Sequence, residues 1–198
     1  MARKYKLKRR AERQKQTRQR IVEATVGLHT TVGPTRTTIA AIAERAGVER
    51  PTIYRHFPTL EDLFGACSSH GWKTNPAPDP EPWLAISDPE ARLRHGLAQL
   101  YAFYERNQHG MWVILRDLED MPELRPFASH RIAHRKRVCE VFVGAWPECD
   151  RRPKLLAAAV AHAVDFFTWR SLRRQGLSNE EAVELMVGLV RDFGSAAR

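Results

Sequence analysis

Apolar residues recur along this chain at intervals of three and four positions, which is the spacing of one face of a helix. No stretch of useful length shows the period-two alternation of a half-buried strand. The pattern predicts helices over residues 11–30, 37–46, 50–57, 59 onward, 88 onward, 111–118, 126–146, 153–175 and 178–193. The predicted fold class is therefore all-α.

Two changes in composition divide the chain. Residues 1–10 show no helical pattern of apolar residues and are predicted to form a disordered basic arm. Residues 74–83 contain four prolines, a density that no helix survives, so a linker or extended loop is expected there. We predict three parts: the arm (1–10), a small helical domain (11–65) and a larger helical domain (66–198).

Charge is concentrated at the N-terminus. The chain has 32 Lys and Arg residues against 23 Asp and Glu residues, a formal net charge of +9. Residues 1–20 hold ten of the basic residues and one acid, Glu12, so the other 178 residues carry 22 of each kind. A basic segment on a neutral body is typical of a phosphate-binding tail. On charge alone, a solvated tail that only aids solubility is the alternative.

Composition argues against several other classes of protein. The 43% of hydrophobic residues suffices for a real core, so global disorder is not expected. No apolar run approaches the roughly 20 residues that span a bilayer, and no apolar signal segment precedes the basic residues. Three separated cysteines, Cys67, Cys139 and Cys149, indicate neither a disulfide framework nor a thiolate metal site. We expect a cytoplasmic protein with reduced thiols.

Residues 38–57 form the most informative motif, two short helical segments joined at Gly47. Glycine supplies the tight backbone position that a side chain would resist, and the apolar residues of both segments are spaced to share one small core. The second segment then presents its polar residues outward: Arg50, Pro51, Thr52, Tyr54, Arg55 and His56. Donors, an aromatic ring and a methyl group are suited to a major groove and its flanking phosphates.

The segment from Thr17 to about Phe64 resembles the N-terminal domain of tetracycline-repressor (TetR) family regulators. The family pattern Thr-x-x-x-Ile-Ala-x-x-Ala-Gly-Val, then Thr-[Leu/Ile]-Tyr-x-His-Phe, then an acidic residue and leucine, is met over 38–48, 52–57 and 62–63. The match covers about a quarter of the chain, and a weaker match over the last two predicted helices extends it. The resemblance implies a three-helix helix-turn-helix DNA-binding domain followed by a helical ligand-binding and dimerisation domain.

Carried over position by position, the resemblance implies two kinds of DNA contact. Phosphate and backbone contacts are expected from Thr38, Tyr54 and His56, and base-edge contacts from Arg50, Pro51 and Thr52. Arg55 lies on the same outer surface, and Arg9 and Arg10 of the arm are expected to add phosphate contacts. The chain departs from the family pattern at Glu49, Pro51 and Leu60, the last of which replaces a usual phosphate-binding Lys.

By the same resemblance, the C-terminal half holds a dimer interface and an effector cavity. Helices 153–175 and 178–193 carry apolar residues on more than one face, which favours a four-helix interface between two copies. The aromatic excess of this half predicts a cavity lined by some of Tyr101, Tyr104, Trp112, Phe142, His162, Phe166 and Trp169. Because such residues are more often core than pocket, a solid core is the alternative.

The predicted function is sequence-specific binding of a pseudo-palindromic double-stranded DNA operator by a homodimeric repressor. A small apolar or aromatic effector is expected to release it. The alternatives are a regulator that is effector-independent or activating, and a non-specific nucleic-acid-binding protein that uses the basic arm without base readout.

An enzyme or a ligand-binding all-α domain with a vestigial motif is the remaining class. No phosphate-binding glycine loop, nucleophile elbow or zincin motif occurs, so neither catalysis nor a cofactor is expected. His130 and His134 have a spacing that can bind a metal, but the basic residues around them would repel a cation. A solvated basic face over 130–137 is the prediction, and no metal site.

Overall fold

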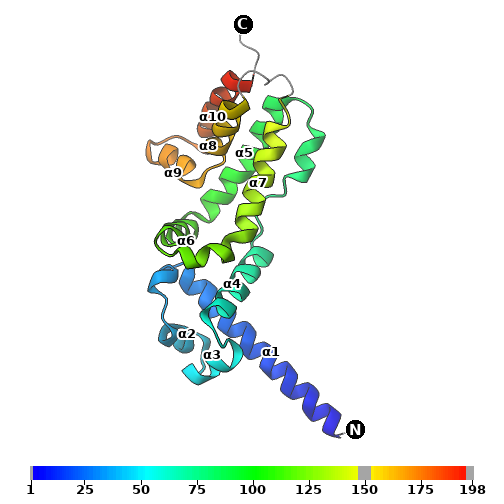
Figure 1. Ribbon diagram of the computed structural model, residues 1–198, viewed down its shortest axis with the longest axis vertical. Coiled ribbons are helices and arrows are strands. Elements are labelled where there is room, and N and C mark those ends of the chain that lie inside the picture. The colour runs from blue at the N-terminus through cyan, green and yellow to red at the C-terminus, as the bar shows by residue number, and fades with distance from the viewer. Residues whose placement is uncertain (1, 147–152, 195–198) are drawn as a thin grey trace. The chain divides into compact units, whose positions relative to one another are not determined.

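The computed structural model describes residues 2–146 and 153–194, and every regular element in these residues is a helix (Figure 1). The predicted all-α fold class is confirmed. The described chain forms two compact units. Unit 1 comprises the residues up to Pro76 together with His109–Ser129, and unit 2 comprises Ala77–Gln108 together with the residues from His130 onward.

Unit 1 is a helical domain built on the N-terminal third of the chain. Its elements are α1 (Ala2–His29), η1 (Pro34–Arg36), α2 (Ile39–Ala46), α3 (Arg50–His56), α4 (Leu60–Thr74), α6 (Gln108–Asp120) and η3 (Pro122–Ala128). One core joins α1 to α4, and Ile21, Ile42, Ile53 and Leu63 are each at most 3% exposed. Burial of such a side chain contributes roughly 1.5–3 kcal/mol to the stability of the fold. The shared core thus holds α2 and α3 against α1 and α4.

The predicted boundary after residue 65 differs from this division. Because Leu63 and Cys67 lie in the core of unit 1, α4 continues with the N-terminal domain to Thr74. Thr59 and Asp62 form a capping box at the start of α4, the helix predicted from residue 59 onward. The segment His109–Ser129 joins unit 1 from far along the chain, and no local pattern could have predicted that contact.

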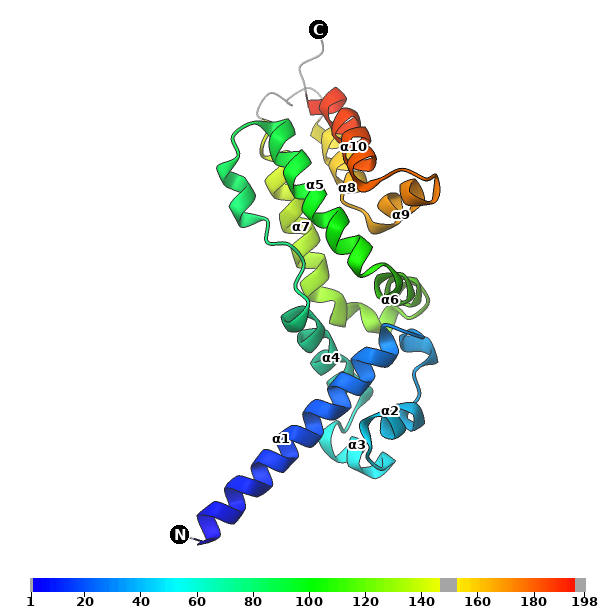
Figure 2. The ribbon, with the colours of Figure 1, turned by 180° about the vertical axis from the view of Figure 1, so that it is seen from behind.

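Residues 2–10 are helical, which corrects the prediction of a disordered arm. α1 begins at Ala2 rather than near residue 11, and Figure 2 shows its N-terminal half continuing beyond α2 and α3. Residues 2–10 are Ala, Leu, Lys and Arg, which are good helix formers, together with Tyr5, and no Gly or Pro precedes Gly27. Packing around Ile21 supplies the nucleus, and a helix with such a nucleus elongates readily through such residues.

Unit 2 is a helical bundle. Its elements are η2 (Glu81–Ala85), α5 (Pro89–Arg106), α7 (Ser129–Val143), α8 (Pro153–Ala163), α9 (Phe166–Arg174) and α10 (Asn179–Gly194). α10 packs against both α5 and α8. Leu97 of α5, Val160 of α8 and Val190 of α10 are completely buried, which places the core between these three helices.

Two predicted helices of this half have different bounds in the structure. The helix predicted over 126–146 begins at Ser129, because residues 126–128 belong to η3, and ends at Val143. The helix predicted over 153–175 is broken at Val164 and Asp165. The Asp165 carboxylate caps α9 by accepting from the backbone N–H groups of Phe167 (2.8 Å) and Thr168 (3.1 Å).

The segment with four prolines is a connection, as predicted, but it is not merely a linker. It ends within η2, and Trp83 in that helix is 1% exposed. The Trp83 ring stacks on Phe142 at 5.2 Å between ring centroids, and its indole N–H donates to Gln99. This connection therefore forms part of the core of unit 2.

Candidate nucleic-acid interface

The α2–α3 pair is held by local geometry that the sequence encodes. The Thr38 hydroxyl accepts from the backbone N–H of Ala41 and caps α2, and Gly47 ends α2 with φ of 62°, in the left-handed region. Ile53 is buried against the core, which fixes the rotation of α3. The opposite side of α3 is therefore turned to solvent.

The predicted contact residues of α3 share that outer side. Arg50, Pro51 and Arg55 are exposed, Tyr54 is 54% exposed, and Thr52 and His56 are partly exposed. Thr38, at the start of α2, is also exposed. Figure 1 shows α2 and α3 adjacent in unit 1. The outer surface of α3 thus carries two guanidinium groups, a phenol, a hydroxyl and an imidazole, with the exposed Glu49 beside Arg50 at its N-cap.

Arg9 and Arg10 lie on α1, some distance along the helix from its contacts with α2. Both are exposed. The Arg9 guanidinium lies over the Tyr5 ring, 5.8 Å from its centroid, whereas Arg10 occupies a neighbouring face of the helix. The two residues are therefore not equivalent, contrary to what a disordered arm implies.

Arg18 is a residue of this region that the sequence did not single out. Its guanidinium lies 4.5 Å from the centroid of the Phe57 ring, at the end of α3. Burial first, and then the charges of Arg55 and Arg18, lower the pKa of His56 from its ordinary value. The neutral form of the imidazole is thereby favoured at this end of α3.

A second feature of unit 1 joins α6 to the segment that leads into α2. Asp117 of α6 is 1% exposed, and its carboxylate accepts from the backbone N–H (2.9 Å) and hydroxyl (2.6 Å) of Thr35. Arg116 pairs with the same carboxylate at 2.6 Å. Gly33 has φ of 96°, and a side chain there would collide with the Asp117 carboxylate. The carboxylate therefore fixes the segment between α1 and α2.

Burial alone would raise the pKa of Asp117, but hydrogen bonds from Thr35 and the Arg116 charge outweigh it and lower the pKa. His29 lies in the same part of unit 1, 7% exposed and stacked on Phe64 at 5.0 Å between ring centroids. Burial lowers the pKa of His29 to about 4, against an opposing influence of the Asp117 charge. Neither residue was predicted, because their contacts bring together segments far apart in sequence.

Four of the residues predicted to line an effector cavity come together in unit 2. Tyr104 meets Phe166 and Trp169 edge-on, at 5.6 and 5.8 Å between ring centroids, and Tyr101 lies beside Tyr104. The phenol groups of Tyr101 and Tyr104 donate to the carbonyls of Ala163 and Val164, the carbonyls left unpaired where α8 ends. These contacts are those of a packed core, and their role in binding an effector stays a prediction.

The other three predicted lining residues lie elsewhere. Phe142 is buried in unit 2 against Trp83, Trp112 is a half-buried residue of α6 in unit 1, and His162 is exposed beside Thr168. The structure therefore does not gather the seven predicted residues at one place.

The basic face predicted over 130–137 is only partly solvated. Arg135 is exposed and lies 3.5 Å from Asp165, and Arg137 pairs with Glu81 at 2.6 Å. Arg131 instead lies beside Tyr104, where burial lowers the pKa of its guanidinium. A helical wheel centred on the buried Val138 and Phe142 could have placed Arg131 on the inner face of α7.

Within residues 2–146 and 153–194, no three His, Cys, Asp or Glu side chains are arranged to hold a metal ion. His134 is hydrogen-bonded to the carbonyl of Pro78 at 2.7 Å. Cys67 and Cys139 are free thiols, and Cys149 lies outside the described residues. None of the described helices is both long enough and apolar enough to cross a membrane.

Comparison with known proteins gave two kinds of similarity. Residues 21–67 match the family model for bacterial regulatory proteins of the tetR family. The fold is similar to a TetR-like transcriptional regulator from Rhodococcus sp. RHA1, with a TM-score of 0.63 and 19% identity over 91% of this chain and 97% of that one. It is also similar to a TetR transcription regulator from Haloarcula marismortui, with a TM-score of 0.59 and 17% identity over 90% and 96%. The search of curated protein sequences found no match.

An exposed polar helix fixed by a tight turn on a three-helix core defines a DNA-binding regulator of the helix-turn-helix class. The family match covers the residues that build this arrangement, and the structural similarity extends the same fold over nearly the whole chain. Residues 21–67 therefore form a DNA-binding domain of the tetR-family type, and the whole chain has the fold of TetR-like transcriptional regulators.

Proposed function

We propose that this protein is a homodimeric repressor that binds a pseudo-palindromic operator and leaves it when a small molecule binds in unit 2. The outer face of α3 carries the DNA-binding part of the proposal. Burial of Ile53 turns Arg50, Tyr54 and Arg55 outward together, and the only acidic side chain beside them is Glu49, at the N-cap of α3.

Base readout is assigned to the start of α3 and backbone contact to its end. Recognition helices present their N-terminal residues to base edges, which favours Arg50, with Pro51 and Thr52 beside it. Arginine binds the O6 and N7 atoms of guanine with two hydrogen bonds, and this pairing discriminates strongly between bases. Tyr54, Arg55, His56 and Thr38 are assigned to phosphates, which position the helix without reading sequence.

Arg50→Ala tests this assignment. On a duplex that the protein selects from a randomised pool, we expect the substitution to cost about 1–3 kcal/mol of binding and to relax the preference at one base pair per half-site. His56→Ala is the matched control within α3, and it should weaken selected and scrambled duplexes by similar factors. Fluorescence anisotropy at fixed salt measures both. Equal losses on the two duplexes for Arg50→Ala would remove its base-reading role.

The dimer is proposed to form through α8 and α10. Unit 2 exposes three leucines on these helices: Leu155 is 48%, Leu185 49% and Leu189 37% exposed. Leu185 and Leu189 stand one turn apart on α10, and the space over Gly188 between them is open. An apolar face of this kind is what a four-helix interface between two copies would cover.

Replacing both Leu185 and Leu189 by Glu should convert the dimer to monomer, because four charges would have to lose their water in the interface. Sedimentation velocity at micromolar concentration measures the state, and binding of the selected duplex should weaken with it. The matched control is Leu84→Glu, since Leu84 is 45% exposed on η2, outside α8 and α10. A wild-type monomer, or a variant that sediments like wild type, would contradict this interface.

Release by an effector is proposed to act through α6. The chain passes from α5 of unit 2 directly into α6 of unit 1, so a shift at the end of α5 reaches α6 through covalent bonds. Asp117 then couples α6 to Thr35, three residues before α2 begins with its cap at Thr38. Movement of α6 would thus change the position of α2 and α3. A small apolar or aromatic molecule suits the residues around Tyr104 and Trp169.

A further inference from the structure

The N-terminal half of α1 is a helix without a partner in its own unit. From Tyr5 to Gln16 every side chain is exposed, and the first buried residue is Ile21. Residues 1–20 nevertheless hold the whole net positive charge of the chain. Because no side chain of this exposed segment is buried, packing does not explain its sequence. The distribution of charge around the helix is therefore the feature that indicates its role.

The basic residues are arranged on one face. Lys6, Arg10, Arg13, Thr17 and Arg20 follow one another at intervals of four, three, four and three residues. At 100° per residue these five side chains lie within about 80° of the helix circumference. We call them the α1 stripe. Acidic residues are missing from this stripe, whereas Glu12, Lys8 and Lys15 lie on the opposite face.

The α1 stripe faces the same side of unit 1 as α2 and α3. Continuing the spacing along α1 leads to Ala24 and Leu28, which pack into the core with Ile42. The guanidinium of Arg20 lies near the turn between α2 and α3, 3.7 Å from where a side chain on Gly47 would begin. The stripe is thus a basic extension of the surface that carries α3.

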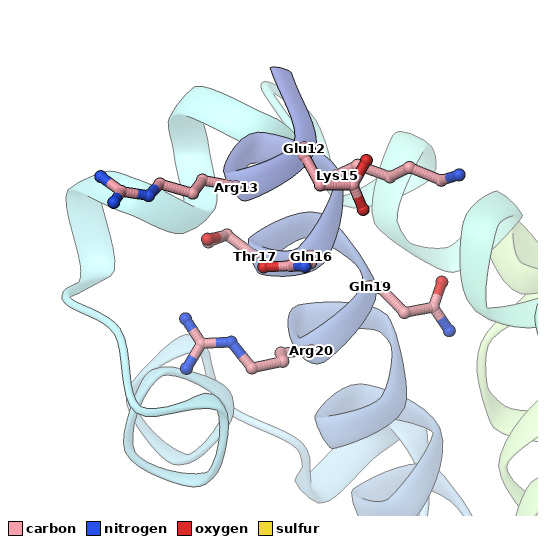
Figure 3. Close-up of a pocket in the computed structure, with 7 residues that line it drawn as sticks. All are labelled: Glu12, Arg13, Lys15, Gln16, Thr17, Gln19 and Arg20. Carbon is pink, nitrogen blue, oxygen red and sulfur yellow. The ribbon is translucent and has the colours of Figure 1, made fainter. Parts of the chain in front are cut away.

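The side chains along this part of α1 are open to solvent, apart from Thr17, which is half-buried. Figure 3 shows Arg13 and Arg20 pointing to the side where α2 and α3 lie, with Thr17 between them, while Lys15 and Gln19 point to the other side. Two guanidinium groups and a hydroxyl are donors suited to phosphate oxygens, and the side chains of Arg13 and Arg20 are exposed.

We propose that the α1 stripe binds the sugar–phosphate backbone of DNA beside the groove that α3 enters, and that it does so as a rigid helix. The inference rests on the proposed role of α3. Lys6 and Arg20 are separated by about 21 Å at 1.5 Å per residue, which is long enough to reach several consecutive phosphates of one strand. The helix is preformed, so binding does not require the ordering of a flexible tail. Phosphates carry no sequence information, so the stripe adds affinity without base preference.

The first test compares equal losses of charge on opposite faces. Arg10→Gln with Arg13→Gln removes two charges from the stripe, and Lys8→Gln with Lys15→Gln removes two from the other face. Glutamine keeps the helix propensity in both. We expect the stripe pair to weaken the selected and the scrambled duplex by similar factors of tenfold or more, and to lower the salt slope of log K by up to about 1.8 per protomer. The control pair should change affinity much less.

The second test separates a rigid helix from a basic tail. One alanine inserted between Lys15 and Gln16 turns all preceding residues by about 100° relative to the rest of α1. Leu7, Ala11 and Gln14 then replace Lys6, Arg10 and Arg13 in the stripe, with no change of charge. We expect a loss of affinity like that of the stripe pair. Circular dichroism of the full-length variants verifies that the helices remain.

Unchanged affinity after the insertion, or equal losses from the two charge pairs, would overturn the inference, because a flexible tail behaves in that way. Either result would leave the proposed function intact as long as the wild-type protein still prefers its selected duplex. Failure of the wild-type protein to prefer any duplex would instead remove the role of α3, on which the inference rests.

Discussion

Asp117→Ala should cost about 3 kcal/mol of the free energy of unfolding of unit 1, because it removes one partner of a buried ion pair and two hydrogen bonds at once. The carboxylate accepts two hydrogen bonds from Thr35 and pairs with Arg116, and it is 1% exposed. Without it the Thr35 backbone N–H loses its acceptor. Arg116 keeps some access to water, which limits the loss.

Chemical denaturation followed by hydrogen exchange locates this effect. Protection of amides around Ile42 and Ile53 should fall, while amides around Leu97 in unit 2 should keep theirs. Glu44→Ala, the removal of an exposed acid from α2, is the control and should change stability by less than about 0.5 kcal/mol. Asp117→Asn keeps the shape and one acceptor, so its loss should be intermediate. Equal stability of the Asp117→Ala and Glu44→Ala proteins would contradict the structural role.

The same substitution tests the route of the effector signal. If α6 moves α2 through Asp117 and Thr35, an effector will bind the Asp117→Ala protein but no longer lower its affinity for the selected duplex. Uncoupled binding of this kind is a loss of coupling free energy, which is measured from the duplex affinity with and without effector. Full retention of the coupling would exclude this contact as the route.

We expect the stability of the protein to fall at acidic pH because of His29. His29 has a pKa of about 4 in the folded protein against an ordinary value of 6.5, so the unfolded chain binds a proton that the folded chain does not. Stability is therefore lost as the pH falls from about 6.5 toward 4. Each pH unit in that window costs up to about 1.4 kcal/mol, and the whole window costs about 3 kcal/mol.

His29→Phe should flatten this dependence, because phenylalanine keeps a ring against Phe64 and cannot titrate. The slope of the unfolding free energy against pH between 6.5 and 4 should fall by up to one proton equivalent relative to wild type. An NMR titration of the His29 ring provides the independent measurement. Parallel stability curves for the two proteins, or a ring that titrates near 6.5, would contradict the buried neutral state.

The DNA-binding motif could be predicted from sequence because its determinants are local. The Thr38 cap, the left-handed Gly47, the outward face of α3 and the capping box at Thr59 all lie within a few residues of the partners that they need. The TetR-family resemblance rested on those same residues, and the family match over residues 21–67 covers them.

What the sequence missed depends on contacts between distant segments. The helix predicted over 153–175 is broken at Asp165. Tyr101 and Tyr104 stabilise this break, because their phenol groups donate hydrogen bonds to the carbonyls of Ala163 and Val164. Asp117 lies 82 residues from Thr35 along the chain, and no local sequence pattern indicates that these two residues are in contact. Helical spacing alone also cannot separate an aromatic core from an effector cavity.

The N-terminal segment shows a different limit. Its charge was informative, but charge alone did not distinguish a flexible arm from a helix. The residues of this segment are good helix formers, and the decisive factor is the core around Ile21, which supplies a nucleus from which the helix extends to Ala2. The basic side chains therefore lie at fixed angles around the axis of α1. Arg9 and Arg10 lie on different faces of this helix.

A direct comparison of duplexes tests sequence-specific DNA recognition by this protein. The wild-type, full-length protein is titrated onto the duplex that it selects from a randomised pool and onto a scrambled duplex of the same length and composition, at one physiological salt concentration. We predict binding to the selected duplex that is about a thousandfold tighter or more, with two half-sites in inverted repeat. Equal affinity for the two duplexes would contradict the account, since it would leave only the attraction of basic residues for phosphate.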